Sequence, residues 1–217
     1  MGRCSAIVSL GLALWTGPAG AQDVIVHKLT VAIHPAVRAR LAQEDIEGIL
    51  KHASRFLQDN NCKVGFELDG PVTTFKSPAD IHNADDLEAV HSVPADVKIV
   101  QSITFCVGQI DKEGFLGCAW RPEGRQKTVV VSITGSLPKM GIASRVWAHE
   151  FGHTTGLLHR YQTGNFSLMT PCEIQAYSAQ LNQDECNHFR AGPVSSYPAG
   201  QGDACPPSLL LRRNRID

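Results

Sequence analysis

Three histidines and one glutamate share the stretch His149-Glu150-Phe151-Gly152-His153-Thr154-Thr155-Gly156-Leu157-Leu158-His159. His149 and His153 are four residues apart, so on a helix their side chains project from one face, one turn apart. Two imidazole nitrogens at that spacing can bind one Zn²⁺ at about 2.0–2.1 Å. Glu150 lies between them in the sequence, near enough to contact a water on the metal without being a ligand. The stretch therefore predicts a zinc site with a carboxylate beside it.

Gly156 accounts for the third histidine. A helix that continued past His153 would carry His159 away from the metal, whereas glycine can adopt positive φ, end the helix and turn the chain. His159 would then complete three protein ligands and leave the fourth position open, as in catalytic zinc sites. Histidines that served only packing or solvation would need neither the glycine nor the third histidine, so we favour metal binding.

The pattern HExxHxxGxxH resembles the signature of the metzincin clan of zinc endopeptidases. The resemblance implies that His149, His153 and His159 bind one catalytic zinc ion. It also implies that Glu150 is the general base and acid of peptide-bond hydrolysis by a zinc-activated water.

Two positions after the motif bear on this resemblance. The clan has a methionine turn beneath the metal, and Met169 in the stretch 167–171 is the candidate for it, with an ordinary core methionine as the alternative. Arg160 follows the third histidine, where families of the clan often differ, and it matches none of the common ones. The family within the clan is therefore not assigned.

An edge strand above the active site binds substrate by main-chain pairing in this clan, and residues 114–120 resemble it by position. The implied substrate-binding residues are Gly114, Phe115, Leu116, Gly117, Cys118 and Ala119. The alternative is an ordinary sheet strand.

Hydrophobic periodicity predicts the elements that must position the site. Helices are expected at 41–59, 144–155 and 182–190, the last with Asn182 and Glu185 as a capping box. Strands are expected at 24–33, 63–68, 97–107, 114–120 and 128–133. Residues 76–95, rich in Asp, His, Asn and Pro, are expected to be a surface connection.

The order of these expected helices and strands along the chain predicts an α+β fold. We expect a two-lobed, metzincin-like zinc peptidase with a mixed twisted sheet, a long helix, an active-site helix and a small irregular C-terminal lobe ending in a helix. The 217 residues suggest a single catalytic domain at 22–217, with an upper lobe over about 22–157 and a lower lobe over about 158–217. The clan has the same order of elements, so the resemblance covers most of the mature chain.

The first residues form a separate unit. One positive charge comes from Arg3, residues 6–15 are apolar, and Ala19-Gly20-Ala21 fits a signal-peptidase site. We expect residues 1–21 to be a signal peptide and the mature chain to be secreted, into the extracellular space or the periplasm. An uncleaved membrane anchor is the alternative, but the apolar run is short, and no later segment is apolar for long enough to span a bilayer.

Six cysteines remain after such cleavage and are expected to form disulfides: Cys62, Cys106, Cys118, Cys172, Cys186 and Cys205. A thiolate zinc site is the alternative, but no two cysteines have CxxC spacing. Sequence does not fix the connectivity, because six cysteines allow 15 pairings. We expect Cys106–Cys118 across a hairpin and Cys172–Cys186 in the C-terminal part, which leaves Cys62 with Cys205.

The composition limits the classes of molecule that the protein is expected to bind. A formal charge of -1, with 43% hydrophobic and 19% charged residues, is ordinary for a soluble globular chain and offers no basic surface for nucleic acid. We expect a monomer that binds a peptide or protein substrate, with a protein inhibitor as a second candidate partner. Calcium is a candidate at Asp80, Asp85 and Asp86, but these lack a full ligand pattern, so a solvated acidic turn is favoured.

Two other functions stay open. One is a secreted, zinc-containing binding module without turnover, which the intact Glu150 disfavours because such a module needs no base. The other is a zinc hydrolase of a non-protein amide, such as a cell-wall peptide.

Overall fold

The structure is a computed structural model that describes residues 23–112, 114–120, 128–132, 140–160, 167–170 and 180–194. The expected signal peptide lies outside the described residues, as do Cys172 and Cys205.

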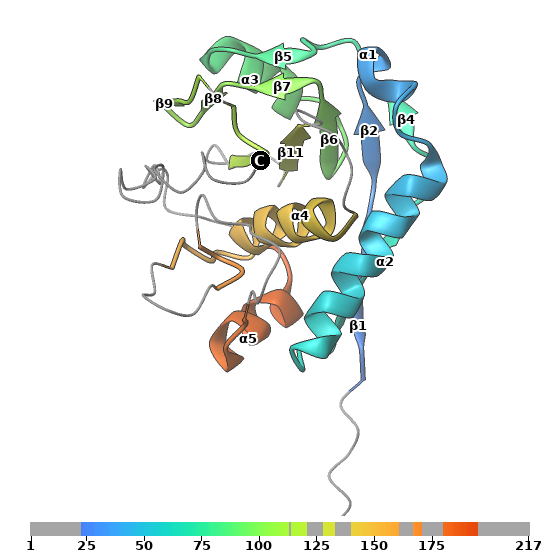
Figure 1. Ribbon diagram of the computed structural model, residues 1–217, viewed down its shortest axis with the longest axis vertical. Coiled ribbons are helices and arrows are strands. Elements are labelled where there is room, and N and C mark those ends of the chain that lie inside the picture. The colour runs from blue at the N-terminus through green and yellow to red at the C-terminus, as the bar shows by residue number, and fades with distance from the viewer. Residues whose placement is uncertain are drawn as a thin grey trace, which may run out of the picture.

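A five-stranded mixed sheet forms the centre of the fold (Figure 1). In spatial order its strands are β10 (Gly117–Trp120), β11 (Thr128–Ser132), β6 (Val97–Val100), β2 (Val31–Ile33) and β4 (Thr73–Thr74). Strand β10 runs antiparallel to β11, and the other neighbouring pairs are parallel. Strand β1 (Ile25–Leu29) precedes β2 directly and pairs in parallel with β3 (Val64–Leu68). The mixed sheet agrees with the prediction, and β10 stands at its edge.

Helices lie on both faces of this sheet (Figure 1). The helices among the described residues are α1 (Pro35–Arg38), α2 (Gln43–Asp59), α3 (Ala84–His91), α4 (Met140–Thr154) and α5 (Gln183–Ala191), and α5 lies beyond α4, away from the sheet. The three expected helices are present as α2, α4 and α5, and α4 begins four residues earlier than predicted. At the start of α5, Asn182 and Glu185 form the expected capping box. Within the described residues, no helix has the length and apolar character needed to cross a membrane.

The prediction of a surface connection at 76–95 is wrong in part, because helix α3 lies there. Asn83 Oδ1 accepts a hydrogen bond from Asp86 N at 2.9 Å and caps the helix. Leu87 and Val90, three residues apart, are 1% and 0% exposed. The two turns of α3 are too short for a clear periodic pattern among so many polar residues.

The long strand expected at 97–107 is also divided. Its first part is β6, and two short strands follow, β7 (Ser102–Ile103) and β8 (Phe105–Cys106). Strand β7 pairs with β5 (Asp80–Ile81), and β8 forms a hairpin with β9 (Gln109–Ile110). The chain therefore leaves the central sheet after Val100.

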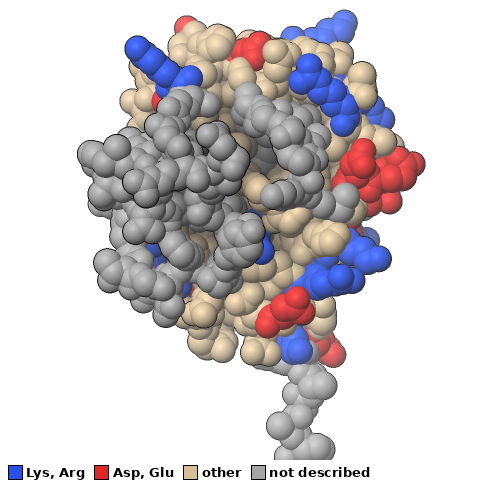
Figure 2. Space-filling model, in the orientation of Figure 1, with Lys and Arg blue, Asp and Glu red and all other residues tan. Residues whose placement is uncertain are grey.

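Two apolar cores hold the layers together. The smaller lies between the sheet and α3, and the larger lies between the sheet, α2, α4 and α5. Helix α2 buries one side against this larger core: Ile46, Ile49, Leu50, Ala53 and Leu57. Its other side is solvated, and Figure 2 shows acidic and basic side chains interspersed over it. Arg145 of α4 stacks over the Phe56 ring of α2, 5.7 Å from its centroid.

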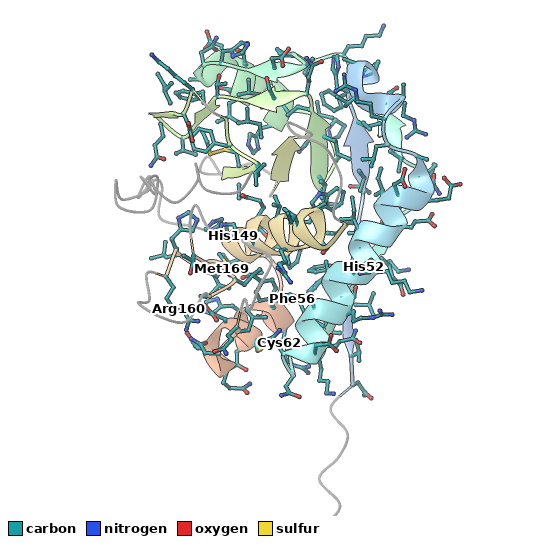
Figure 3. All side chains as sticks on the ribbon, in the orientation of Figure 1. His52, Phe56, Cys62, His149, Arg160 and Met169 are labelled. Carbon is teal, nitrogen blue, oxygen red and sulfur yellow. A yellow bond between two sulfur atoms is a disulfide. The ribbon has the colours of Figure 1, made fainter. Side chains whose placement is uncertain are left out.

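Two disulfides join distant parts of the chain. Cys106 pairs with Cys118 as expected, with Cα atoms 5.8 Å apart. The other two expected pairs are wrong, because Cys62 pairs with Cys186, with Cα atoms 5.0 Å apart. This bond ties the loop after α2 to α5, near the bottom of the view in Figure 3. Packing of α5 against the end of α2 decides this pairing, and no spacing of cysteines could reveal it.

Candidate metal centre

Helix α4 carries two of the three histidines and is anchored by its apolar side. The anchoring side chains are buried in the larger core: Val146, Trp147, Ala148 and Phe151. His149 is 3% exposed, and His153, one turn later, is half-buried. A helix held in this way presents both imidazoles in the same direction.

Helix α4 ends in a glycine cap. Gly156 has a φ of 91°, in the left-handed region that favours glycine. Gly156 N donates to His153 O at 3.0 Å, and Leu157 N donates to Gly152 O at 3.2 Å. These two bonds define the Schellman motif. The chain turns here, as the sequence predicts, and brings His159 back toward the two helix histidines.

The three histidines meet at their Nε2 atoms. These atoms are 3.1 Å apart between His149 and His153, 3.0 Å between His149 and His159, and 2.9 Å between His153 and His159. Two nitrogens that bind one zinc ion at about 2.0–2.1 Å can be at most about 4 Å apart. All three pairs satisfy this limit, so the side chains fit a single metal ion.

Backbone carbonyls determine which nitrogen carries the proton in two of the rings. His149 Nδ1 donates to Leu168 O at 2.6 Å, and His153 Nδ1 donates to Leu157 O at 2.8 Å. Since a carbonyl oxygen only accepts, Nε2 of each neutral ring carries a lone pair. Two lone pairs that face each other form no hydrogen bond, but one cation can accept both. Carbonyls in this position are usual orienting partners of metal-bound histidines.

The protonation of His149 is consistent with this arrangement. Burial lowers the pKa of its imidazole well below the usual range, and the neighbouring rings of His153 and His159 lower it further. The hydrogen bond to Leu168 O acts in the opposite direction. The neutral form, which binds metals, is therefore favoured.

Met169 lies next to the histidine helix, and Figure 3 shows it just below His149. It is 0% exposed and belongs to the turn 167–170, which Thr170 N closes by donating to Ser167 O at 3.0 Å. A β-carbon on Gly152 of α4 would lie 2.7 Å from Met169 Sδ. Glycine is therefore required at position 152 for the methionine to approach the helix this closely. The candidate for the methionine turn does lie against the histidine helix.

Glu150 faces the edge strand of the sheet. Its side chain is 6% exposed and lies against Gly117 of β10, where a β-carbon would be 2.5 Å from both Cγ and Oε1 of Glu150. The carboxylate is thus enclosed between α4 and the edge strand.

The residues expected to form the substrate strand divide into two groups. Gly114 has a φ of 90°, and its N donates to Asp111 O at 3.1 Å. Phe115 N donates to Ile103 O at 2.7 Å, and neither residue belongs to a strand. Leu116 follows, 36% exposed. Strand pairing begins only at Gly117 and includes Cys118 and Ala119. The predicted strand is therefore three residues too long at its start.

Sequence reasoning missed the polar residues that support the site. Ser167, Arg160 and Glu185 connect the methionine turn, the third histidine and helix α5. The capping-box pattern indicates Glu185 only as a helix cap. Its contacts with the other two residues depend on how α5 packs.

The chain was compared with protein families, curated proteins and solved structures. No family model matches the chain, and no curated protein does. Among solved structures, the chain matches the crystal structure of metalloproteinase-II from Bacteroides fragilis, with 14% sequence identity and a TM-score of 0.42. The match covers 80% of this chain and 55% of that one, so the chain spans little more than half the length of this neighbour. A likeness of this size identifies no function.

Proposed function

We propose that this protein is a secreted zinc endopeptidase of the metzincin type, with residues 1–21 as its signal peptide. One observation carries the proposal. Three imidazoles converge at 2.9–3.1 Å, and carbonyl partners hold two of them with their lone pairs toward the same point. A buried carboxylate, Glu150, is adjacent to this point in the sequence.

In this proposal His149, His153 and His159 are the metal ligands. Zinc is the ion expected for three imidazoles with an open position, and when bound it would acidify a water and polarise the scissile carbonyl. Glu150 accepts the proton of the attacking water and then delivers it to the departing amine. Enclosure by α4 and β10 limits the positions that the Glu150 carboxylate can take.

The edge strand β10 supports an extended peptide as the substrate. It has a hydrogen-bonded neighbour on one side, β11, among the described strands. An extended peptide can add to such an edge by main-chain pairing. We assign the whole of 22–217 to one catalytic domain, with an upper lobe over about 22–157 and a lower lobe over about 158–217.

The decisive experiment combines metal analysis with a cleavage assay on the exported protein. We expect one zinc per chain and cleavage of an unfolded protein such as reduced, alkylated casein. A chelator should abolish the cleavage, and added zinc should restore it. Zinc without cleavage of casein would indicate a binding module or a hydrolase of another amide, and a panel of cell-wall peptides separates these two. Absence of stoichiometric metal would refute the site itself.

A further inference from the structure

Glu185 in the first turn of α5 is a carboxylate that is 4% exposed. Burying a carboxylate is costly unless it is paired and hydrogen-bonded, so the partners of Glu185 reveal what keeps it there. One oxygen, Oε2, accepts from Asn182 N at 2.8 Å. This contact completes the capping box and needs nothing more from the side chain.

The second oxygen of Glu185 has two partners outside α5. Ser167 Oγ donates to Oε1 at 2.9 Å, and Arg160 Nε lies 3.3 Å from the same atom. A helix cap requires neither contact. Both partners belong to segments that carry or support metal-site histidines.

Arg160 directly follows His159. Its backbone N donates to Met169 O at 2.8 Å, and its carbonyl accepts from Thr170 Oγ1 at 3.1 Å. The ion pair with Glu185 adds a third attachment, through the side chain. The backbone of the third histidine is therefore fixed from one side by contacts to the methionine turn and to α5.

Ser167 fixes the turn that orients His149. Its hydroxyl accepts from Met169 N at 3.1 Å while it donates to Glu185. The next residue, Leu168, supplies the carbonyl that accepts from His149 Nδ1 at 2.6 Å. A shift of this turn would move the group that orients His149.

We propose that Glu185 is a positioning residue of the metal centre. Its Oε1 atom joins the segment that carries His159 to the turn that orients His149. Glu185 therefore fixes the positions of these two ligands relative to each other. Figure 3 shows Met169 between the histidine helix and α5, with Arg160 to the left of α5 in this view. The inference rests on the proposed function only in taking the three histidines to be metal ligands. Loss of an outer partner of this kind typically weakens metal binding by about 10- to 100-fold.

The test is the zinc affinity of Glu185→Gln, measured by competition with a chromophoric chelator. Glutamine retains an oxygen for the Asn182 N–H but loses the charge that pairs with Arg160. We expect the dissociation constant for zinc to rise about 10- to 100-fold. The visible spectrum of the Co²⁺-substituted protein should also change. Asp184→Asn is the matched control, because Asp184 is an exposed carboxylate in the same turn. This control should leave both readouts unchanged.

The outcomes separate this inference from the proposed function. If Glu185 acted only as a helix cap, Glu185→Gln would keep the wild-type zinc affinity and Co²⁺ spectrum, because glutamine preserves the cap, and this result would overturn the inference. Wild-type protein that binds no zinc would overturn the proposed function as well. The double variant Arg160→Gln/Glu185→Gln is measured in parallel, because it leaves no unpaired buried charge and should fold even where the single variant does not. It should show the same loss of affinity.

Discussion

Gly117 of the edge strand and Glu150 of the histidine helix are in such close contact that a β-carbon on Gly117 would lie 2.5 Å from Glu150 Oε1. The two residues belong to different layers and are 33 positions apart in the chain. The absence of a side chain at position 117 therefore creates the space that the Glu150 carboxylate occupies. The edge strand takes part in the site through this contact, whatever its role toward a substrate.

Gly117→Ala should displace the Glu150 carboxylate. A misplacement of about 1 Å can cost about 100-fold in rate, so we expect kcat/KM to fall by about that factor while zinc content stays at the wild-type level. Gly141→Ala is the matched control, because a β-carbon at Gly141 meets nothing within 4 Å. Equal activity of Gly117→Ala and wild type would show that the carboxylate can shift without consequence.

Glu150→Gln should separate metal binding from turnover. We expect about one zinc per chain to remain, because Glu150 is not among the proposed ligands, and kcat to fall by about 10²- to 10⁴-fold with the loss of the proposed base. Glu47→Gln, an exposed change on α2, should be neutral. Undiminished cleavage by Glu150→Gln would refute its assignment as the base.

Gly152→Ala should destabilise the fold. The new β-carbon would meet Met169 Sδ at 2.7 Å and Phe189 Cζ at 3.1 Å. Overpacking of this kind costs about 1–3 kcal/mol, whereas alanine in a helix interior gains about 1 kcal/mol over glycine. We expect a lower free energy of unfolding in urea for Gly152→Ala and a neutral or raised value for Gly141→Ala on the same helix. The opposite order would mean that Met169 is not tightly packed against α4.

Lys98 should make the stability depend on pH in the alkaline range. This side chain of β6 is 0% exposed, and its ammonium donates to His91 O at 3.4 Å. Burial lowers its pKa from 10.5 to about 7, although the nearby Asp96 acts in the opposite direction. Between these two pH values the unfolded chain binds the proton that the folded chain has released, so the unfolding free energy rises with pH.

The measurement is urea unfolding of metal-free protein from pH 7 to 10, compared with Lys98→Met. The wild-type free energy should rise relative to the variant by at most about 1.4 kcal/mol per pH unit. Lys51→Met, at an exposed position on α2, should keep the wild-type slope. Parallel curves for wild type and Lys98→Met would contradict a lowered pKa.

Local sequence was sufficient to predict the histidine cluster. Helical periodicity puts His149 and His153 on one face, and Gly156 ends the helix because glycine adopts the left-handed backbone of the turn without steric cost. These properties involve neighbouring residues only. The structure accordingly has the predicted helix end, and His159 returns to the two helix histidines.

The tertiary structure decided which residues surround and support the histidine cluster. The Cys62–Cys186 bond, the contact of Gly117 with Glu150 and the contacts of Glu185 Oε1 join segments that are far apart in the chain. Which of these segments meet depends on how helices pack on the sheet and on each other, and many arrangements are compatible with the same local patterns. The sequence by itself therefore determined which histidines meet and the turn that brings them together, whereas packing selected the residues that hold them in place.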